Sequence, residues 1–298
     1  MLNRVDEIID SYLYDLQSDI VTKLYKEVTS GKKLRAKLIL KIAGANKEAY
    51  ELAAIVEMIQ TASLLHDDVI DDADTRRGKS SINALFGNKT AIMLGDILYS
   101  KAFFELTSLP EFVAKSISDA VTKLSIGELL DVELSKSFNT KEDRYFDMID
   151  KKTASLIEAS AASAAYISGK DSKKFALYGK NLGLAFQIVD DVLDIVQDSE
   201  TLGKPALHDF KEGKATLPYI HLYQRLPKED KKILESFFKK DLSREDKEWI
   251  KKRMVEYKVI DESVNLAKKL GFEAIESIKE YKNGDLEKII SDMIEREY

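Results

Sequence analysis

The chain has 298 residues, of which 46 are lysine or arginine and 52 are aspartate or glutamate, so its formal net charge is −6. It contains no cysteine, which excludes disulfides, iron–sulfur clusters, thiol nucleophiles and cysteine-bound zinc. Any metal must therefore be held by oxygen atoms or by the three histidines. The acidic balance argues against a nucleic-acid partner, because such binding depends on clustered basic side chains.

The scarcity of turn-forming residues predicts an all-α fold. Only 13 glycines and 4 prolines occur, too few for an all-β chain of this length. No linker rich in serine, glycine or proline interrupts the sequence, so we expect a single domain over residues 1–298. Acidic residues near the N-terminus do not fit a secretory signal, and no run of 18 or more apolar residues occurs. We expect a soluble, cytoplasmic protein without a transmembrane segment.

Three segments show the apolar spacing of core helices, in chain order. The stretch between Gly44 and Gly78 has apolar residues at roughly helical spacing and is predicted to be one long helix. Residues 154–165 are dense in alanine and serine, which predicts a central helix that approaches its neighbours closely. Residues 182–196 predict another core helix. From about residue 224 onward, alternating charged and apolar stretches predict amphipathic surface helices without chemistry.

Two of these helices end in nearly the same acidic sequence. Asp67-Asp68-Val69-Ile70-Asp71 and Asp190-Asp191-Val192-Leu193-Asp194 are two copies of the pattern D-D-V-x-D. On a helix, residues four apart lie on one face, so each copy predicts a pair of neighbouring carboxylates. Carboxylate ligands without cysteine and with little histidine favour Mg²⁺, which is commonly held by one or two carboxylates together with substrate phosphates. Two facing clusters would therefore grip a diphosphate through bridging metal ions.

The alternative for each cluster is a solvated helix end that pairs with nearby basic residues. The duplication disfavours that alternative, and so do the basic segments near the clusters. A diphosphate site needs cations besides the metals, and arginine presents a planar fork that suits phosphate oxygens. The basic segments are Gly31-Lys32-Lys33-Leu34-Arg35, Arg76-Arg77-Gly78, Gly203-Lys204 and Gly213-Lys214.

With these segments, the chain resembles the trans-isoprenyl diphosphate synthases, also called polyprenyl synthases, and most closely the octaprenyl and hexaprenyl diphosphate synthases among them. The resemblance extends over most of the chain. It departs from the family pattern at Ala36, where the family has proline, and at residues 206–209. The matching motifs are residues 31–35, 67–78, 152–154 (Lys-Thr-Ala), 186–194 with 203–205, and 212–214.

The resemblance implies a large, single-domain, all-α helical bundle with a deep central cavity, the isoprenoid synthase fold, usually as a homodimer. It also implies Mg²⁺, three ions per active site with diphosphate bound. Asp67, Asp71 and Asp190 would hold these ions, and Asp68 completes the metal-binding set. Asp191 and Asp194, like Asp68, would add charge or hydrogen bonds around the metal ligands. The metal ions would neutralise the charge that develops on the departing diphosphate.

The resemblance also assigns the two substrates to different basic residues. Catalysis beside the allylic cation would fall to Lys152, Thr153 and Gln187. His66 adjoins the first cluster and is expected to be a hydrogen-bonding neighbour rather than a metal ligand. The residues for isopentenyl diphosphate would be Lys32, Arg35, Gln60 and Arg77. Those for the allylic diphosphate would be Arg76, Lys152, Thr153, Gln187 and Lys204.

Small residues precede the first acidic cluster and predict a medium- or long-chain product. Ser63 lies one turn before Asp67 on the same face, and Ala62 precedes it. Short-chain members of the family tend to carry a bulky aromatic residue here or an insertion in the motif. We therefore expect an all-trans product of about C30 to C40, made from a primer such as farnesyl diphosphate and isopentenyl diphosphate. Release of so apolar a product would involve transient membrane contact.

Three other functions compete with this one. A short-chain synthase would make farnesyl or geranylgeranyl diphosphate. A class I terpene cyclase normally has a different second metal motif, whereas this chain repeats D-D-x-x-D. A noncatalytic synthase subunit would be expected to have lost acidic or basic ligands that are all present here. We therefore favour chain elongation.

Overall fold

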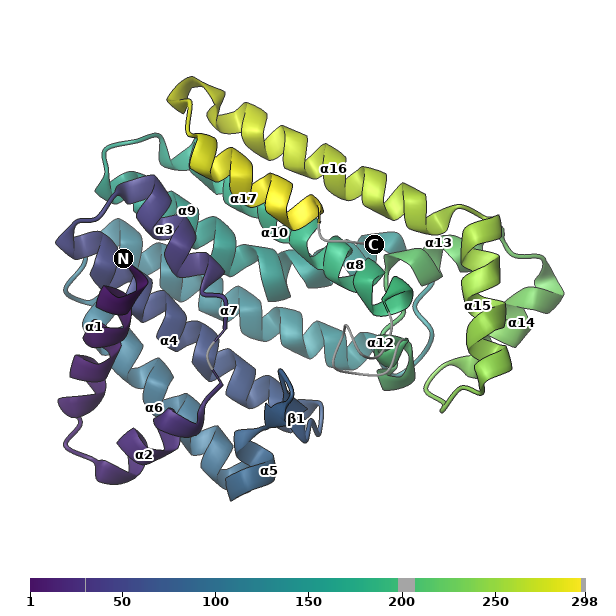
Figure 1. Cartoon of the computed structure of the whole chain (residues 1–298), viewed down its shortest axis with the longest axis horizontal. Helices are drawn as coiled ribbons and strands as arrows, with labels where there is room; N and C mark the ends of the chain where they lie inside the picture. The colour runs from purple at the N-terminus through teal and green to yellow at the C-terminus, as the bar shows by residue number, and fades with distance from the viewer. Residues whose placement is uncertain (30, 198–206, 296–298) are drawn as a thin grey trace. The chain divides into compact units, whose positions relative to one another are not determined.

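A computed structural model of the chain describes residues 1–29, 31–197 and 207–295. The described residues form helices and one two-stranded hairpin, as Figure 1 shows, so the all-α prediction is confirmed. Contacts between residues divide the chain into two compact units. The first unit contains Met1–Val121 and Leu156–Ala176, and the second contains Thr122–Ser155 and Leu177–Tyr298.

The first unit is built around α4, Lys47–Ile70. This helix begins at Asn46, whose side chain accepts a hydrogen bond from the backbone N–H of Ala49 and so caps the first turn. Most residues from Leu52 to Leu65 are buried, as expected for a helix surrounded by others. Its neighbours are α1 (Leu2–Tyr14), α3 (Leu34–Ala43), α5 (Ile82–Phe86) and α6 (Asn88–Leu106).

Helices α4 and α6 lie side by side (Figure 1) and approach closely at Gly95. A Cβ atom at residue 95 would lie 2.3 Å from Nε2 of His66, so only glycine leaves room for that ring. The remaining elements of this unit are α2 (Asp19–Glu27), β1 (Thr75–Arg76), β2 (Lys79–Ser80), the beginning of α7 (Glu111–Leu134), most of α9 (Ser155–Ile167) and the beginning of α10 (Ser172–Val196).

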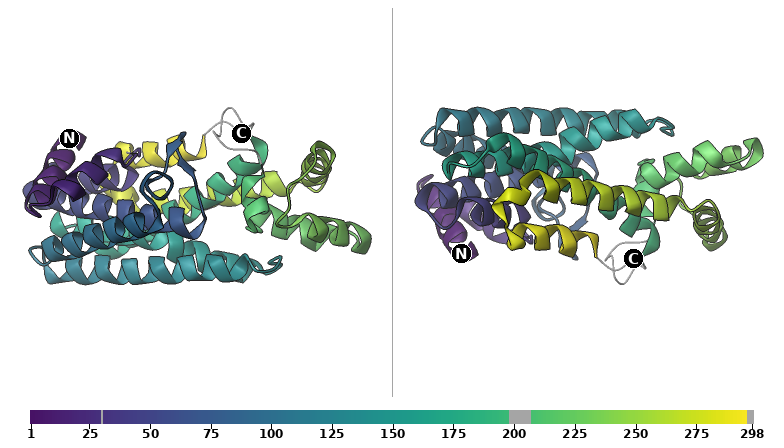
Figure 2. Two further views of the ribbon diagram at one scale, coloured as in Figure 1. Left: turned by 90° about the horizontal axis from the view of Figure 1, so that it is seen from below. Right: turned by 90° about the horizontal axis from the view of Figure 1, so that it is seen from above.

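The second unit contains the later parts of α7 and α10 and the C-terminal helices. Figure 2 shows α16 and α17 side by side. The helices after residue 224 bury only a narrow apolar face, which confirms the prediction of amphipathic surface helices. The elements are α8 (Glu142–Ile149), a π-helical segment η1 (Asp150–Ala154), α12 (His208–Glu212), α13 (Leu217–Arg225), α14 (Lys228–Phe237), α15 (Arg244–Glu256), α16 (Val259–Ile278), η2 (Lys279–Tyr281) and α17 (Gly284–Ile294).

The predicted core helices are present, although some of their ends differ from the prediction. The long helix after Gly44 is α4, and the apolar segment ending at Val196 is α10, which starts ten residues earlier than the apolar pattern indicates. The alanine-rich helix is α9, and its residues are almost all buried. Within the described residues, no helix is both long enough and apolar enough to cross a membrane.

Candidate active site

The first acidic cluster lies at the C-terminal end of α4. The chain leaves this helix through a Schellman motif, in which the backbone N–H of Ala73 donates to the carbonyl of Asp68 (2.9 Å) and that of Asp72 donates to the carbonyl of Val69 (3.4 Å). Asp72 adopts the left-handed conformation that this ending requires, with φ of 49°. The motif fixes the last turn, and with it the positions of Asp67 and Asp71.

Helix polarity makes both acidic clusters electrostatically unfavourable by themselves. The C-terminus of a helix carries partial negative charge, so each carboxylate there costs about 0.3–1 kcal/mol. The last turns of α4 and of α10 contain no basic residue that would offset this cost. Two helix ends that gather aspartates against their own dipoles are suited to binding cations.

The three aspartates of the first cluster have two different environments. Asp67 and Asp71 are partly exposed, whereas Asp68 is 4% exposed and forms an ion pair with Arg76. Nε and Nη2 of Arg76 lie 2.7 and 2.6 Å from Oδ1 of Asp68. The structure therefore ties Arg76, which was predicted to contact the allylic diphosphate, to Asp68 of the predicted metal-binding set.

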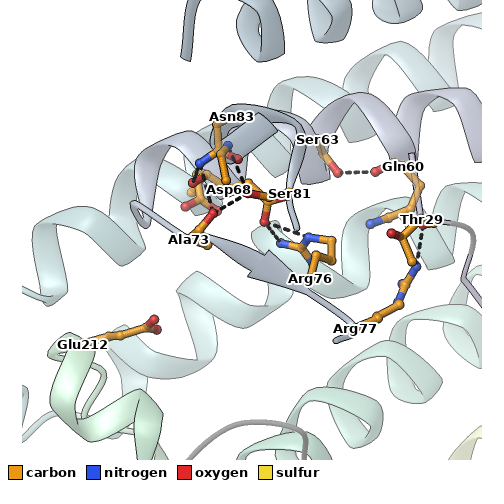
Figure 3. A network of polar contacts seen from close by, with 12 residues as sticks. Thr29, Gln60, Ser63, Asp68, Ala73, Arg76, Arg77, Ser81, Asn83 and Glu212 are labelled. Atoms are coloured by element: carbon orange, nitrogen blue, oxygen red, sulfur yellow. Dashed lines mark hydrogen bonds and ion pairs between the residues drawn. The ribbon is translucent and has the colours of Figure 1, made fainter. Parts of the chain in front are cut away.

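Arg76 reaches Asp68 from the hairpin of β1 and β2. Residues Arg77 and Gly78 form its two-residue turn, with φ of 54° and 73°, the geometry of a type I′ turn. Asn83 anchors the hairpin by donating from Nδ2 to the backbone oxygens of Asp68 (3.1 Å) and Ala73 (3.0 Å), as Figure 3 shows. The hairpin thus has a fixed place at the end of α4.

The same turn brings Arg77 to the segment before α3. The Arg77 guanidinium donates to the backbone oxygen of Thr29 (3.1 Å) and lies against Gly31, where a Cβ atom would be 2.7 Å from its nitrogens. Figure 3 shows the hydrogen bond of Arg77 to Thr29. The structure thereby brings together two segments, 31–35 and 76–78, that the sequence marked separately as basic. Lys32, by contrast, is exposed.

Arg35 and Gln60 carry buried polar atoms that suit a ligand. Within the described residues, Nε of Arg35 and Oε1 of Gln60 have no hydrogen-bond partner. Burial lowers the pKa of Arg35 to about 10, and the carboxylate of Glu57 opposes this shift. Burial likewise lowers the pKa of Arg77, as does the charge of Arg76. Guanidinium groups that are this poorly compensated favour a bound anion.

Glu57 is a charged neighbour of Arg35 and Arg77. It was not predicted from the sequence as a site residue. Its carboxylate accepts a hydrogen bond from the backbone N–H of Ala36 (3.0 Å). Proline, which the family pattern has at position 36, lacks that N–H group. The departure at Ala36 therefore supplies a backbone donor for a buried carboxylate, whose pKa burial raises.

His66 faces α6 rather than the acidic cluster. Its Nε2 lies 3.2 Å from the backbone oxygen of Ile92 and 3.4 Å from Oδ1 of Asp96. This contact agrees with the expectation of a hydrogen-bonding neighbour. Ala62 and Ser63, the predicted chain-length residues, are buried at 0% and 3% exposure, and the Ser63 hydroxyl donates to the backbone oxygen of Gln60.

The second acidic cluster, at the end of α10, also divides by exposure. Asp190 is exposed, whereas Asp191 and Asp194 are 3% and 2% exposed. Asp194 connects the cluster to the start of α12. Its backbone oxygen accepts from the N–H of Leu207 (2.9 Å), and its carboxylate accepts from the N–H of Asp209 (3.2 Å).

One group of side chains on α12 has metal-ligand geometry. The ligand atoms of His208, Asp209 and Glu212 lie within 4.8 Å of one another, so the three could hold a metal ion. Nδ1 of His208 is 3.1 Å from Oε1 of Glu212, and Nζ of Lys214 is 2.8 Å from Oε2 of Glu212. Burial alone would raise the pKa of Glu212, but His208 and Lys214 outweigh burial and lower it to about 2. No role was predicted from the sequence for His208, Asp209 or Glu212.

Lys152 is held by two carboxylates of α7. Its Nζ lies 2.7 Å from Oε2 of Glu128 and 2.6 Å from Oδ2 of Asp131, and both acids are buried. Lys152 and Thr153 belong to the π-helical segment η1, a type of irregularity common at functional sites. Two glycines let neighbouring helices approach this segment. A Cβ atom at Gly127 would be 2.2 Å from the backbone N of Lys152, and one at Gly183 would be 2.6 Å from Cα of Ala154.

Thr153 begins a chain of hydrogen bonds that runs into the interior. Its hydroxyl donates to Oε1 of Gln187 (2.7 Å), and Nε2 of Gln187 donates to Oδ1 of Asp191 (2.9 Å). The other carboxylate oxygen of Asp191 accepts from the Tyr145 hydroxyl at 2.5 Å. Burial, and then the charge of Asp209, raise the pKa of Asp191 well above its usual range.

The structure thus groups the predicted site residues into two sets, one in each compact unit. The second set contains Lys152, Thr153, Gln187 and Asp190. Lys204 lies outside the described residues. The sequence analysis missed Glu57, Glu128, Asp131, Tyr145 and the group on α12. The first set contains Asp67, Asp68, Asp71, Arg76, Arg77, Gln60 and Arg35.

Comparisons with known proteins place this chain among prenyl diphosphate synthases. The model of a family described as polyprenyl synthetase matches residues 18–257. Geranylgeranyl diphosphate synthase from Sulfolobus acidocaldarius is 36% identical over 305 aligned residues, covering 94% of this chain and 90% of that protein.

Two solved structures are also similar over nearly the whole chain. Octaprenyl pyrophosphate synthase from Helicobacter pylori is 46% identical, with a TM-score of 0.95, covering 99% of this chain and 98% of that one. A polyprenyl synthase from Caulobacter crescentus, solved in complex with calcium and isoprenyl diphosphate, is 30% identical, with a TM-score of 0.91, covering 100% and 95%.

Proposed function

Because the chain belongs to the polyprenyl synthetase family and is therefore a prenyltransferase, we propose that it elongates an allylic primer such as farnesyl diphosphate. Isopentenyl diphosphate is added head to tail, in repeated cycles, until an all-trans product of about C30 to C40 is released. The observation that carries this proposal is the pair of helix ends, on α4 and α10, where exposed aspartates stand against the helix dipole.

The donor set fits Mg²⁺. Asp67, Asp71 and Asp190 present exposed or partly exposed carboxylates, and oxygen ligands are what this ion prefers. We propose that these three hold the metal ions, three per active site with diphosphate bound, and that Asp68 holds Arg76 in place beside them. When bound, the metal stabilises the negative charge that develops on the leaving diphosphate. The calcium and isoprenyl diphosphate of the Caulobacter crescentus structure support this proposal by similarity.

The isopentenyl diphosphate is proposed to bind at Arg35 and Arg77 of the first unit. Arg35 is a desolvated guanidinium group, so an anionic ligand would offset the cost of its burial, and Arg77 adds a second guanidinium whose pKa is lowered by burial and by Arg76. Gln60 contributes its amide, and Lys32 contributes a mobile charge from an exposed position.

The allylic diphosphate is proposed to contact Arg76, Lys152 and Lys204. Glu128 and Asp131 hold the ammonium of Lys152 in one place, which reduces the entropy that it loses on binding a substrate. The oxygens of Thr153 and Gln187 form a fixed electronegative pair beside which an allylic cation would be stabilised.

Two chain lengths have support. The small, buried Ala62 and Ser63 and the similarity to an octaprenyl pyrophosphate synthase favour about C30 to C40. The second candidate is a short-chain product, favoured by the similarity to a geranylgeranyl diphosphate synthase over 94% of this chain. We also propose that residues 1–298 act as one polyprenyl synthase domain, as a homodimer in the cytoplasm, with transient membrane contact during product release.

Product sizing tests the proposed function. Purified protein is incubated with Mg²⁺, farnesyl diphosphate and labelled isopentenyl diphosphate, and the dephosphorylated products are separated by length. We expect a ladder that ends between about C30 and C40 and disappears when the metal is chelated. A single C20 product would support the short-chain candidate, a cyclised hydrocarbon would indicate a terpene cyclase, and unchanged substrates would contradict the proposal.

A further inference from the structure

A buried tyrosine stands at the inner end of the hydrogen-bond chain that starts at Thr153. Tyr145 lies on α8 with 1% of its surface exposed, and its hydroxyl donates to Oδ2 of Asp191 at 2.5 Å. The other oxygen of Asp191 accepts from Nε2 of Gln187 at 2.9 Å. Oε1 of Gln187 in turn accepts from the hydroxyl of Thr153 at 2.7 Å.

The carboxylate of Asp191 decides which way the Gln187 amide faces. Nε2 of Gln187 donates to Oδ1 of Asp191, so the amide oxygen faces Thr153. Rotating the amide by 180° would replace this donor with an oxygen atom, and the hydrogen bond observed to Asp191 would be lost. The Thr153 hydroxyl is therefore the donor, and both oxygens of this pair keep lone pairs for a positive charge.

Tyr145 in turn fixes the rotation of the Asp191 carboxylate. One carboxylate oxygen is enough to bind the Gln187 amide, and without a second partner the group could turn about its terminal bond. The Tyr145 hydroxyl occupies the second oxygen, and α8 holds it there. Asp191 and Gln187 are four residues apart on α10, so they share one helix face.

We propose that Tyr145 is a positioning residue for prenyl transfer. Acting through Asp191, it keeps the amide oxygen of Gln187 directed at Thr153, so that two oxygens are in place where the allylic cation develops. This inference rests on the proposed function and adds to it a residue on α8, a helix that contributes no predicted substrate ligand. It predicts that the Tyr145 hydroxyl affects the chemical step and not substrate binding.

The test is Tyr145→Phe, with Tyr178→Phe as the matched control. Tyr178 is also fully buried, and its hydroxyl donates one hydrogen bond to the backbone oxygen of Leu286 at 2.8 Å. Each variant loses one buried hydroxyl and one hydrogen bond, so their melting temperatures should fall by similar amounts. We expect kcat to fall about tenfold in Tyr145→Phe, with KM for isopentenyl diphosphate within about twofold, and to stay within about twofold in Tyr178→Phe.

A double-mutant cycle separates positioning from general loosening. In a Gln187→Ala background the amide is absent, so adding Tyr145→Phe should change kcat by less than about twofold. A loss that persists in that background would overturn the proposal, and so would equal kcat values for the two tyrosine variants. If the unsubstituted protein does not elongate at all, the proposed function fails and this inference fails with it. An active protein whose Tyr145→Phe variant is unimpaired would contradict the inference alone.

Discussion

The aspartates of the two acidic motifs differ in exposure to solvent. Asp67, Asp71 and Asp190 reach the surface, whereas Asp68 is buried against Arg76. Asp191 and Asp194 are buried as well, and they orient Gln187 and the start of α12. The motif alone identifies six acids as a group. Their separation into exposed and buried residues depends on partners that are distant in sequence.

Several residues of the site were predictable from sequence and others were not. The basic segments at 31–35 and 76–78 were marked separately from the sequence, and only the hairpin turn explains why Arg77 reaches Thr29 beside the first of them. Tyr145, Glu128 and Asp131 were missed because each has its partner on another element, Asp191 for Tyr145 and Lys152 for the two acids. The spacing of Glu128 and Asp131 within an apolar helix was the one available signal, since buried acids need a cation.

The substitution Ala62→Phe tests the proposal that the product tail passes this residue. Ala62 is completely buried five residues before Asp67. If the product tail passes this position, the ring of Ala62→Phe occupies its path and the product should shorten by several isoprene units. The measurement is the product length with farnesyl diphosphate as primer.

Stability provides the control for this substitution. Forcing a ring into a fully packed site costs about 1–3 kcal/mol, whereas a ring that enters an open cavity costs less. Ala62→Ser adds little volume and should leave the product unchanged. A folded Ala62→Phe enzyme with the original product length would count against the assignment.

At the scale of elements, the sequence predicted where the helices lie more accurately than it predicted local departures from α-helical geometry. Apolar spacing located α4 and the end of α10, because burial imposes the helical period on the apolar residues. The π-helical segment η1 was not predictable, because Lys152-Thr153-Ala154 reads as ordinary helix. The signal in the sequence was the pair Gly127 and Gly183, two glycines inside long helices. Glycine inside a helix lowers its stability by about 1 kcal/mol, so its presence there indicates a close approach of another segment.

Gly127→Ala tests whether close packing positions η1. The new Cβ atom would lie 2.2 Å from the backbone N and 2.6 Å from the Cα of Lys152, and backbone atoms cannot move aside cheaply. We expect a loss of about 1–3 kcal/mol in the free energy of unfolding and a lower kcat, measured by urea denaturation and steady-state kinetics.

Gly284→Ala is the matched control, because a Cβ atom at this first residue of α17 meets nothing within 4 Å. That variant should be neutral or more stable by up to about 1 kcal/mol. Equal stabilities of the two variants would show that the approach of α7 to η1 is not a packing constraint.

For the whole molecule, composition predicted the fold class and motif order predicted the family. The few glycines and prolines predicted an all-α chain, and the lack of cysteine predicted oxygen or histidine ligands for any metal; of these predictions the fold is confirmed, and so is the family. Product length was beyond the sequence, because the acidic and basic motifs concern the diphosphate groups and not the path of the growing chain. Similar proteins include both octaprenyl and geranylgeranyl synthases, so the same motifs serve different lengths.

The central claim is that exposed aspartates from both motifs hold the metal that prenyl transfer requires. The most direct measurement is the rate of Mg²⁺-dependent incorporation of labelled isopentenyl diphosphate by Asp67→Asn and Asp190→Asn. Asp72→Asn is the control, since Asp72 is exposed next to the first motif and asparagine also tolerates its φ of 49°. We expect losses of at least about 100-fold in both motif variants and almost none in the control. Full activity in either motif variant would contradict the account.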